Sequence, residues 1–115
     1  MSIKDNLNRL TRLSDQSDIQ DFVTRWCSTY DGKIIDFNLD EEAYHLVFRA
    51  DGNIVLKDGL STSFDLRLIT TPQILTEILR GSKSMKEVLK TGELKTWGNF
   101  HEAKPLEQFM RLIIE

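Results

Sequence analysis

Three glycines divide residues 71–103 into segments too short to be stable on their own, and this division constrains the fold more than any other feature. Gly81, Gly92 and Gly98 stand at the ends of these segments, and glycine ends a helix readily because it adopts a left-handed conformation without a Cβ clash. An isolated helix shorter than about 12–15 residues is marginal in water. The short helices must therefore lie on an apolar surface formed by the rest of the chain.

Each short helix has its own start signal. Thr71 followed by Pro72 predicts the first, because threonine caps helix N-termini and proline is favoured in the first turn. Ser84 and Glu87 have the spacing of a capping box and predict the second. Apolar residues follow each start at helical spacing: Ile74, Leu75, Ile78 and Leu79, then Met85, Val88 and Leu89. Residues 93–97 are too short for a helix, so we expect a strand or an extended connector.

Asn99 with Glu102 indicates a further helix start, but Pro105 follows closely. An interior proline removes a hydrogen bond and costs about 3 kcal/mol. We therefore predict a short turn over residues 100–103 and a main helix that begins at Pro105. Its apolar face is formed by Leu106, Phe109, Met110 and Ile113.

Two helices are predicted before the central part of the chain. The first begins near Ile3 and ends near Ser14. The second begins with a capping pair of Ser17 and Gln20 and continues to residues 31–32. Its wide, aromatic-rich stripe suits a helix that lies flat on a sheet. The residues of this stripe are Ile19, Phe22, Val23, Trp26, Cys27 and Tyr30.

From Lys33 the apolar period changes to two, which predicts strands. Asp51-Gly52 indicates a tight hairpin of type I′, with positive φ at both central positions, and Asp58-Gly59 another turn. Four strands joined by tight turns predict an antiparallel meander with one apolar face. The inward residues are Ile35, Phe37 and Leu39, then Tyr44, Leu46, Phe48 and Ala50, then Ile54 and Leu56, then Phe64, Leu66 and Leu68. With the later strand, the expected class is α+β, an antiparallel or mixed five-stranded sheet with helices on one face.

The 115 residues fit a single domain, 1–115, in which residues 1–16 form an N-terminal helical extension. The net charge of −3 argues against nucleic-acid binding. Apolar runs fall short of the roughly 20 residues that span a membrane, and the N-terminus lacks the apolar region of a signal peptide. The single cysteine, Cys27, excludes an internal disulfide and agrees with a reducing compartment. We expect a cytoplasmic protein.

Side chains that carry chemistry are few. An enzyme needs a nucleophile, a base and an orienting group together, and neither His45 nor His101 has a partner in the sequence pattern. Cys27 lies on an apolar stripe, where a thiol usually acts as a small buried hydrophobe. The acidic cluster at residues 40–42 could attract a cation but fits a solvated turn better. The expectation is no catalytic residue, no metal and no cofactor.

Residues 75–99 resemble the C-terminal half of the sterol carrier protein type 2 family, the SCP-2-like lipid-binding domain. The shared run is L-x-x-I-L-R-G-S-x-x-x-x-x-V-L-K-x-G-E-L-K-x-x-G-N. In that family a helix ends in glycine, a second helix leads to G-x-L-K-x-x-G, and a last helix follows. The corresponding positions here are Gly81, Gly92, Leu94, Lys95, Gly98 and Leu106.

The resemblance implies non-catalytic binding or transfer of an apolar lipid in a cavity between sheet and helices. The ligand would be a sterol, fatty acid, acyl-CoA, phospholipid or isoprenoid. The side chains expected to line the cavity are Trp26, Phe48, Leu79, Met85, Leu89, Trp97, Phe109, Met110 and Ile113. Each also fits an ordinary hydrophobic core, and only the resemblance favours a cavity.

A basic face is predicted on the second short helix, with a role in contacting anionic lipid head groups or acyl-CoA phosphates. Each exposed cation adds about 1 kcal/mol at a charged membrane surface. A solvated helix face is the alternative interpretation. The residues are Arg80, Lys83, Lys86 and Lys90. At most transient membrane-surface contact is expected.

A second functional hypothesis keeps the same fold but fills its core. The domain would then be an accessory module that docks on a partner enzyme. Some members of the SCP-2-like family, which this sequence resembles, occur as accessory domains. A fully packed interior and a stoichiometric protein partner would favour it over lipid carriage.

Overall fold

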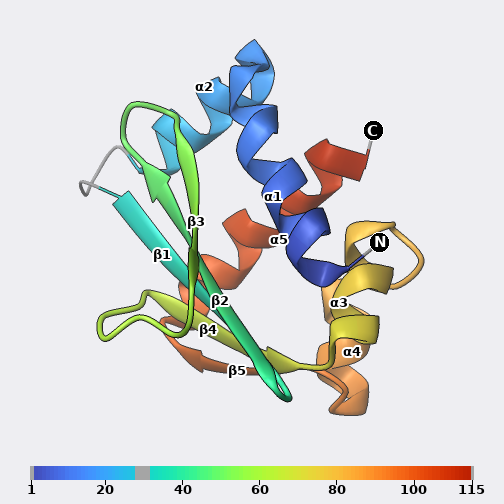
Figure 1. Cartoon of the computed structure of the whole chain (residues 1–115). Helices are drawn as coiled ribbons and strands as arrows, with labels where there is room; N and C mark the ends of the chain where they lie inside the picture. The colour runs from blue at the N-terminus through green and yellow to red at the C-terminus, as the bar shows by residue number, and fades with distance from the viewer. Residues whose placement is uncertain (1, 28–31, 115) are drawn as a thin grey trace.

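The computed structural model describes residues 2–27 and 32–114, with side chains described as far as Leu112. Five strands form one sheet, and Figure 1 shows the helices gathered on one side of it. The α+β class is therefore confirmed. In chain order the elements are α1 Ile3–Arg12, η1 Leu13–Asp15, α2 Ser17–Trp26, β1 Gly32–Leu39, β2 Glu42–Arg49, β3 Ile54–Asp58, β4 Leu66–Thr70, α3 Pro72–Leu79, α4 Met85–Thr91, β5 Lys95–Gly98, η2 Phe100–Glu102 and α5 Ala103–Ile114.

The sheet is mixed, with strand order β3-β2-β1-β4-β5. The β1–β2, β2–β3 and β4–β5 pairs are antiparallel, whereas β4 pairs with β1 in parallel. The predicted four-stranded meander is therefore wrong beyond β3. Residues 59–65 carry the chain from β3 past β2 and β1 to the position of β4 on the far side of β1. The turn signal at Asp58-Gly59 predicts that the chain turns there but does not predict which strand the next one pairs with.

Asp36 fixes this crossover from the outer face of β1. Its carboxylate is fully buried and accepts a 2.8 Å hydrogen bond from the Ser61 hydroxyl and a 3.0 Å hydrogen bond from the Arg67 guanidinium. A buried charge is costly unless it is paired and hydrogen-bonded. Because Ser61 lies in the connection and Arg67 in β4, one carboxylate holds both against β1.

Phe64 was expected on the inner face of a strand, and this prediction is wrong. It precedes β4, and the Arg67 guanidinium lies 4.2 Å from the centre of its ring. A Cβ on Gly98 would come within 2.9 Å of that ring and 2.8 Å of the Asp65 carbonyl oxygen. Glycine at position 98 thus permits the close approach of this loop to β5.

The β2–β3 hairpin forms as predicted, but its turn is not type I′. Gly52 has φ of 92°, whereas Asp51 is not among the described residues with positive φ. The Asp51 carboxylate instead accepts a 2.9 Å hydrogen bond from the Asn53 N–H, a local bond typical of aspartate in turns. The Gln20 side chain on α2 would lie 2.4 Å from a Cβ at position 52, so the hairpin packs closely beneath α2.

The predicted caps of the two short helices are confirmed. Thr71 accepts from the Ile74 N–H and Ser84 from the Glu87 N–H, each at 3.1 Å. Gly81, with φ of 81°, follows α3, and the Ser82 N–H donates to the Glu77 carbonyl as in a Schellman motif.

Three other helix ends differ from prediction. Ser17 is the first residue of α2 rather than its cap, and the helix ends at Trp26 instead of continuing to residue 31. Tyr30, predicted on its stripe, lies outside the described residues. The main C-terminal helix begins at Ala103 rather than Pro105, because Pro105 then stands in the first turn, where a missing N–H is tolerated.

The core lies between the inner sheet face and the helices. The largest fully buried side chains are Phe37 of β1, Phe48 of β2 and Phe109 of α5. The N-terminal helix α1 contributes buried Ile3 and Leu7 to the same core. Within the described residues, every helix is too short or too polar to cross a membrane.

Candidate functional site

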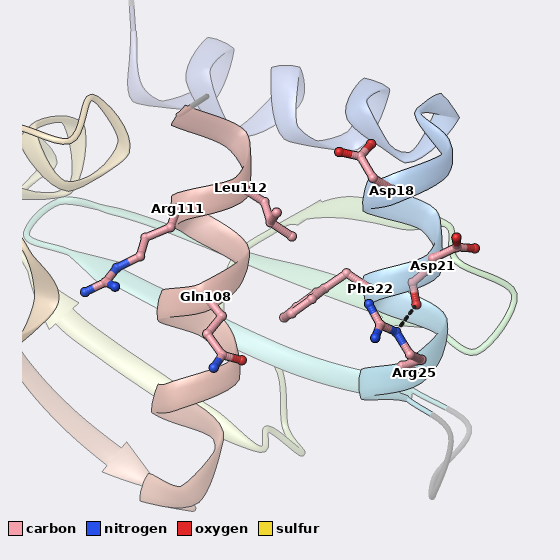
Figure 2. A pocket seen from close by; sticks show the side chains of 7 residues that line it. All are labelled: Asp18, Asp21, Phe22, Arg25, Gln108, Arg111 and Leu112. Atoms are coloured by element: carbon pink, nitrogen blue, oxygen red, sulfur yellow. Dashed lines mark hydrogen bonds between the residues drawn. The ribbon is translucent and has the colours of Figure 1, made fainter.

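A groove runs between α2 and α5. Its first part has a volume of about 420 Å³, and Figure 2 shows Phe22 extending from α2 and Leu112 from α5 into the space between the helices. Its second part has a volume of about 260 Å³ and shares Phe22, Arg25 and Gln108 with the first part. We call the two together the α2–α5 groove, lined by Asp18, Asp21, Phe22, Arg25, Trp26, Pro105, Gln108, Arg111 and Leu112.

Four aromatic rings connect this groove to the sheet. Phe22 and Trp26 are four residues apart on α2, so they share a helix face, and their ring centres are 6.2 Å apart. Trp26 contacts Phe48 of β2 at 4.8 Å, and Phe48 meets Phe109 edge-on at 5.1 Å. Phe109 in turn lies 6.3 Å from Phe22. The cluster continues from the groove, at Phe22, to the buried sheet surface, at Phe48.

Trp26 carries an unsatisfied polar atom. Its indole Nε1 is buried and has no hydrogen-bond partner within the described part of the chain. A buried donor without an acceptor costs about 1–3 kcal/mol. The indole N–H is therefore shielded from the α2–α5 groove, although other atoms of the Trp26 side chain line it.

Charge is distributed unevenly along the groove. Asp18, Asp21, Arg25 and Arg111 line the first part, so their charges compensate one another. Arg25 donates from Nε to the Asp21 carbonyl oxygen at 3.3 Å, and Arg111 pairs with Glu107 at 2.9 Å. Among the described residues that line the second part, Arg25 alone carries a charge.

Two smaller pockets lie on the other side of α5, against α3 and α4. One of about 180 Å³ includes Met85 and Met110, and the other, of about 220 Å³, includes Met85, Leu89 and Phe100. Methionine adapts its shape readily to different apolar groups. Lys83 is among the residues that line the first pocket and Lys86 among those that line the second, which places part of the predicted basic face beside apolar surface.

Residues 7–111 match the model of the SCP-2 sterol transfer family. The chain belongs to this family. A search of curated proteins found no match. The groove, the aromatic cluster and the methionine-lined pockets are therefore features of an SCP-2 domain.

Solved structures share the SCP-2 fold at low sequence identity. A structure described as UbiJ-SCP2 ubiquinone synthesis protein has a TM-score of 0.74 and 14% identity, over 96% of this chain and 94% of that one. Palmitated SCP2L2 from Aedes aegypti gives 0.63 and 13%, over 96% and 95%. The sec-alkylsulfatase Pisa1 from Pseudomonas sp. gives 0.67 and 17%, but the match covers 84% of this chain and only 14% of the sulfatase.

The side chains predicted to bind lipid fall into three places in this SCP-2 domain. Trp26, Phe48 and Phe109 meet in the aromatic cluster. On the other side of α5, Met85 and Met110 line one small pocket, and Met85 and Leu89 line the other. Leu79 is buried in the core. The side chain of Ile113 lies outside those that the structure describes.

Trp97 was expected under the helices, and this placement is wrong. It lies opposite Arg67 in the β4–β5 pair, on the outer sheet face, and is 66% exposed. Side chains of a strand alternate between the two faces of the sheet. Leu94, just before β5, is buried on the inner face, so Trp97, three positions later, points to the outer face.

The predicted basic face is weaker than expected. Lys83 pairs with Glu93 at 3.1 Å and with Glu77 at 3.4 Å, and the hydrogen bond with Glu93 raises the pKa of Lys83. Arg80, Lys86 and Lys90 are exposed to solvent. Three cations therefore remain accessible where four were predicted.

Phe22, Arg25, Gln108, Arg111 and Leu112 were not identified as site residues from the sequence. The helical stripe placed Phe22 beside Trp26, so spacing alone could have identified it. The polar groove residues give no such signal, because they lie on the edges of helices whose packing partners are set by the fold.

Proposed function

We propose that this SCP-2 domain binds or transfers an apolar lipid without catalysing a reaction, with the α2–α5 groove as the entry. The observation that carries the proposal is the continuity between the groove and the aromatic cluster. A volume of about 420 Å³ is within the usual range of small-molecule sites, about 300–1,000 Å³. Burial contributes about 0.8 kcal/mol per CH₂ group.

The ligand class is a sterol, fatty acid, acyl-CoA or isoprenoid. Family membership supports lipid binding in general, and the palmitated relative from Aedes aegypti supports an acyl chain in particular. The rings of Phe22, Trp26, Phe48 and Phe109 already contact one another, so an incoming chain must move them apart. We therefore expect the aromatic cluster to rearrange on binding.

Binding without catalysis agrees with the chemistry of the described side chains. The His45 Nδ1 lies 2.9 Å from the Gly59 carbonyl oxygen, so this ring nitrogen is already hydrogen-bonded to the backbone. The Cys27 thiol donates to the Phe48 carbonyl oxygen at 3.3 Å, and burial raises its pKa to about 11. A thiol with such a pKa is a poor nucleophile near neutral pH, since the thiolate is the reactive form.

The test is titration of delipidated protein with a fluorescent fatty acid, followed by displacement with unlabelled palmitate. Phe22→Glu should weaken saturable binding at least about tenfold, because a charge is placed on an apolar wall. Phe100→Glu is the matched control. Phe100 lines a pocket on the other side of α5, so that variant should bind as the wild type does. Absence of saturable binding to the wild type would refute the proposal.

An accessory role is the second candidate, favoured by two exposed aromatic side chains. Trp97 of β5 is 66% exposed and Phe100 of η2 is 60% exposed, at the edge of the sheet away from the α2–α5 groove. Aromatic residues are enriched at protein interfaces. The relative described as a ubiquinone synthesis protein supports a role beside enzymes of a lipid pathway. Reconstitution with a purified partner should give a defined stoichiometry by light scattering, lost in the Trp97→Ser, Phe100→Ser double variant.

A further inference from the structure

A surface that is both basic and apolar lies on the other side of α5 from the α2–α5 groove. Leu89 of α4 and Phe100 of η2 line a pocket of about 220 Å³ there, together with Lys86 and Lys104. Phe100 is 60% exposed, and both lysines are exposed to solvent. Lys90 is also exposed and lies four residues after Lys86, so it shares the same side of α4. We call these residues the α4–α5 patch.

The positive charge of the α4–α5 patch is not neutralised by neighbouring carboxylates. Its three lysines form no salt bridge with the described residues. Glu107 lines the same pocket, but its carboxylate already pairs with Arg111 at 2.9 Å. Glu87 lines the neighbouring pocket, which Lys83 and Arg111 also line, and Glu102 is buried. The patch is therefore positive on a chain whose net charge is −3.

Apolar side chains flanked by lysines suit the interface of an anionic bilayer. Phe100 and Leu89 can enter the boundary between head groups and acyl chains. Lysine side chains are long enough to keep their ammonium groups among the head groups while their stems cover apolar surface. Each lysine near an anionic membrane surface strengthens the attraction. A protein interface fits the patch less well, because lysine is depleted in protein interfaces.

We propose that the α4–α5 patch docks this domain on the surface of an anionic lipid bilayer. Phe100 is the apolar anchor, and the three lysines contact the anionic head groups. The inference rests on the proposed function for its purpose, because a lipid carrier loads or releases its ligand at a bilayer. Docking itself is a separate property, since α5 presents Lys104 to the patch and Gln108 to the groove.

The test is co-sedimentation of the delipidated full chain with vesicles of phosphatidylcholine alone or mixed with an equal amount of phosphatidylserine. The protein should sediment with the anionic vesicles only, and added salt should release it, because salt screens exposed charges. The double variant Lys86→Glu, Lys104→Glu should bind these vesicles at least about tenfold more weakly. The matched control, Arg49→Glu with Lys57→Glu, makes the same change in net charge near the opposite edge of the sheet and should lose much less. Equal losses in the two double variants would overturn the inference.

Phe100→Glu separates docking from lipid binding. It should weaken vesicle binding at least about tenfold, because a carboxylate replaces the apolar anchor. Saturable fatty-acid binding in vesicle-free solution should be retained. Trp97→Glu is the matched control, since Trp97 is 66% exposed but lies on the outer sheet face. No sedimentation with either vesicle, or sedimentation that Phe100→Glu leaves unchanged, would overturn the inference and leave the patch to a protein partner. Docking without any fatty-acid binding would instead refute the proposed function.

Discussion

Lys33 and Glu102 form an ion pair inside the domain. The Lys33 Nζ lies 2.6 Å from the Glu102 Oε2, and the two side chains are 7% and 9% exposed. The Glu102 Oε2 lacks a well-aligned hydrogen bond within the described structure, so charge attraction dominates the contact. The pair joins the start of β1 to η2 and thereby positions the chain just before α5. The α5 wall of the α2–α5 groove thus depends on a buried charge near the start of β1, far away in the sequence.

Lys33→Met should destabilise the protein by about 3–5 kcal/mol, because it leaves the Glu102 carboxylate buried without its cation. Urea denaturation followed by circular dichroism measures the loss. The double variant Lys33→Met, Glu102→Leu should recover most of it, since two apolar side chains of similar volume replace the pair. A double variant as unstable as the single one would show that Lys33 acts mainly through other contacts.

Asp36→Ala should cost a similar amount, about 3–5 kcal/mol, because Arg67 loses its buried partner and Ser61 loses its acceptor. The matched control is the exposed pair of Lys4 and Asp58, 3.2 Å apart. Asp58→Ala should change the free energy of unfolding by less than about 1 kcal/mol. Equal effects of the two substitutions in urea denaturation would show that the Asp36 network does not hold the crossover.

The elements that sequence analysis predicted well are those with local causes. Thr71, Ser84 and Gly81 begin or end helices through bonds to residues close in sequence, so their roles were readable. The β1–β2–β3 hairpins followed from period-two patterning. The same reasoning failed for β4, because its position depends on Asp36, a polar residue whose partners lie 25 and 31 positions away.

The candidate site was predictable only on its aromatic side. Trp26, Phe48 and Phe109 are large apolar residues on elements that face one another, and their meeting required only the correct fold. Trp97 has the same chemistry, yet strand alternation turned it outward. The unsatisfied Trp26 N–H could not be predicted at all, since satisfaction of a donor depends on the positions of individual acceptor atoms.

The Cys27 thiol should react slowly in the native state. Burial raises its pKa to about 11 from an ordinary value of about 9, so the folded state resists ionisation. Because the pKa is raised, its contribution to stability is fully present below pH 9 and is lost as the pH rises from about 9 to 11. Modification by N-ethylmaleimide at pH 8 should be slow in buffer and fast in denaturant. Equally fast reaction in both would contradict burial of the thiol.

Phe109→Ala should open a cavity within the aromatic cluster and reduce stability by about 3–5 kcal/mol. Under the proposed function this cavity adjoins the α2–α5 groove, because Phe109 contacts Phe22. Saturating myristate should then raise the melting temperature of the variant more than that of the wild type, since a ligand that binds only the folded state stabilises it. Phe37→Ala is the matched control, because Phe37 is equally buried on β1 but makes no ring contact with the described cluster residues. Equal rescue of both variants would mean that the ligand reaches the core without passing the cluster, and the groove would lose its role as the entry.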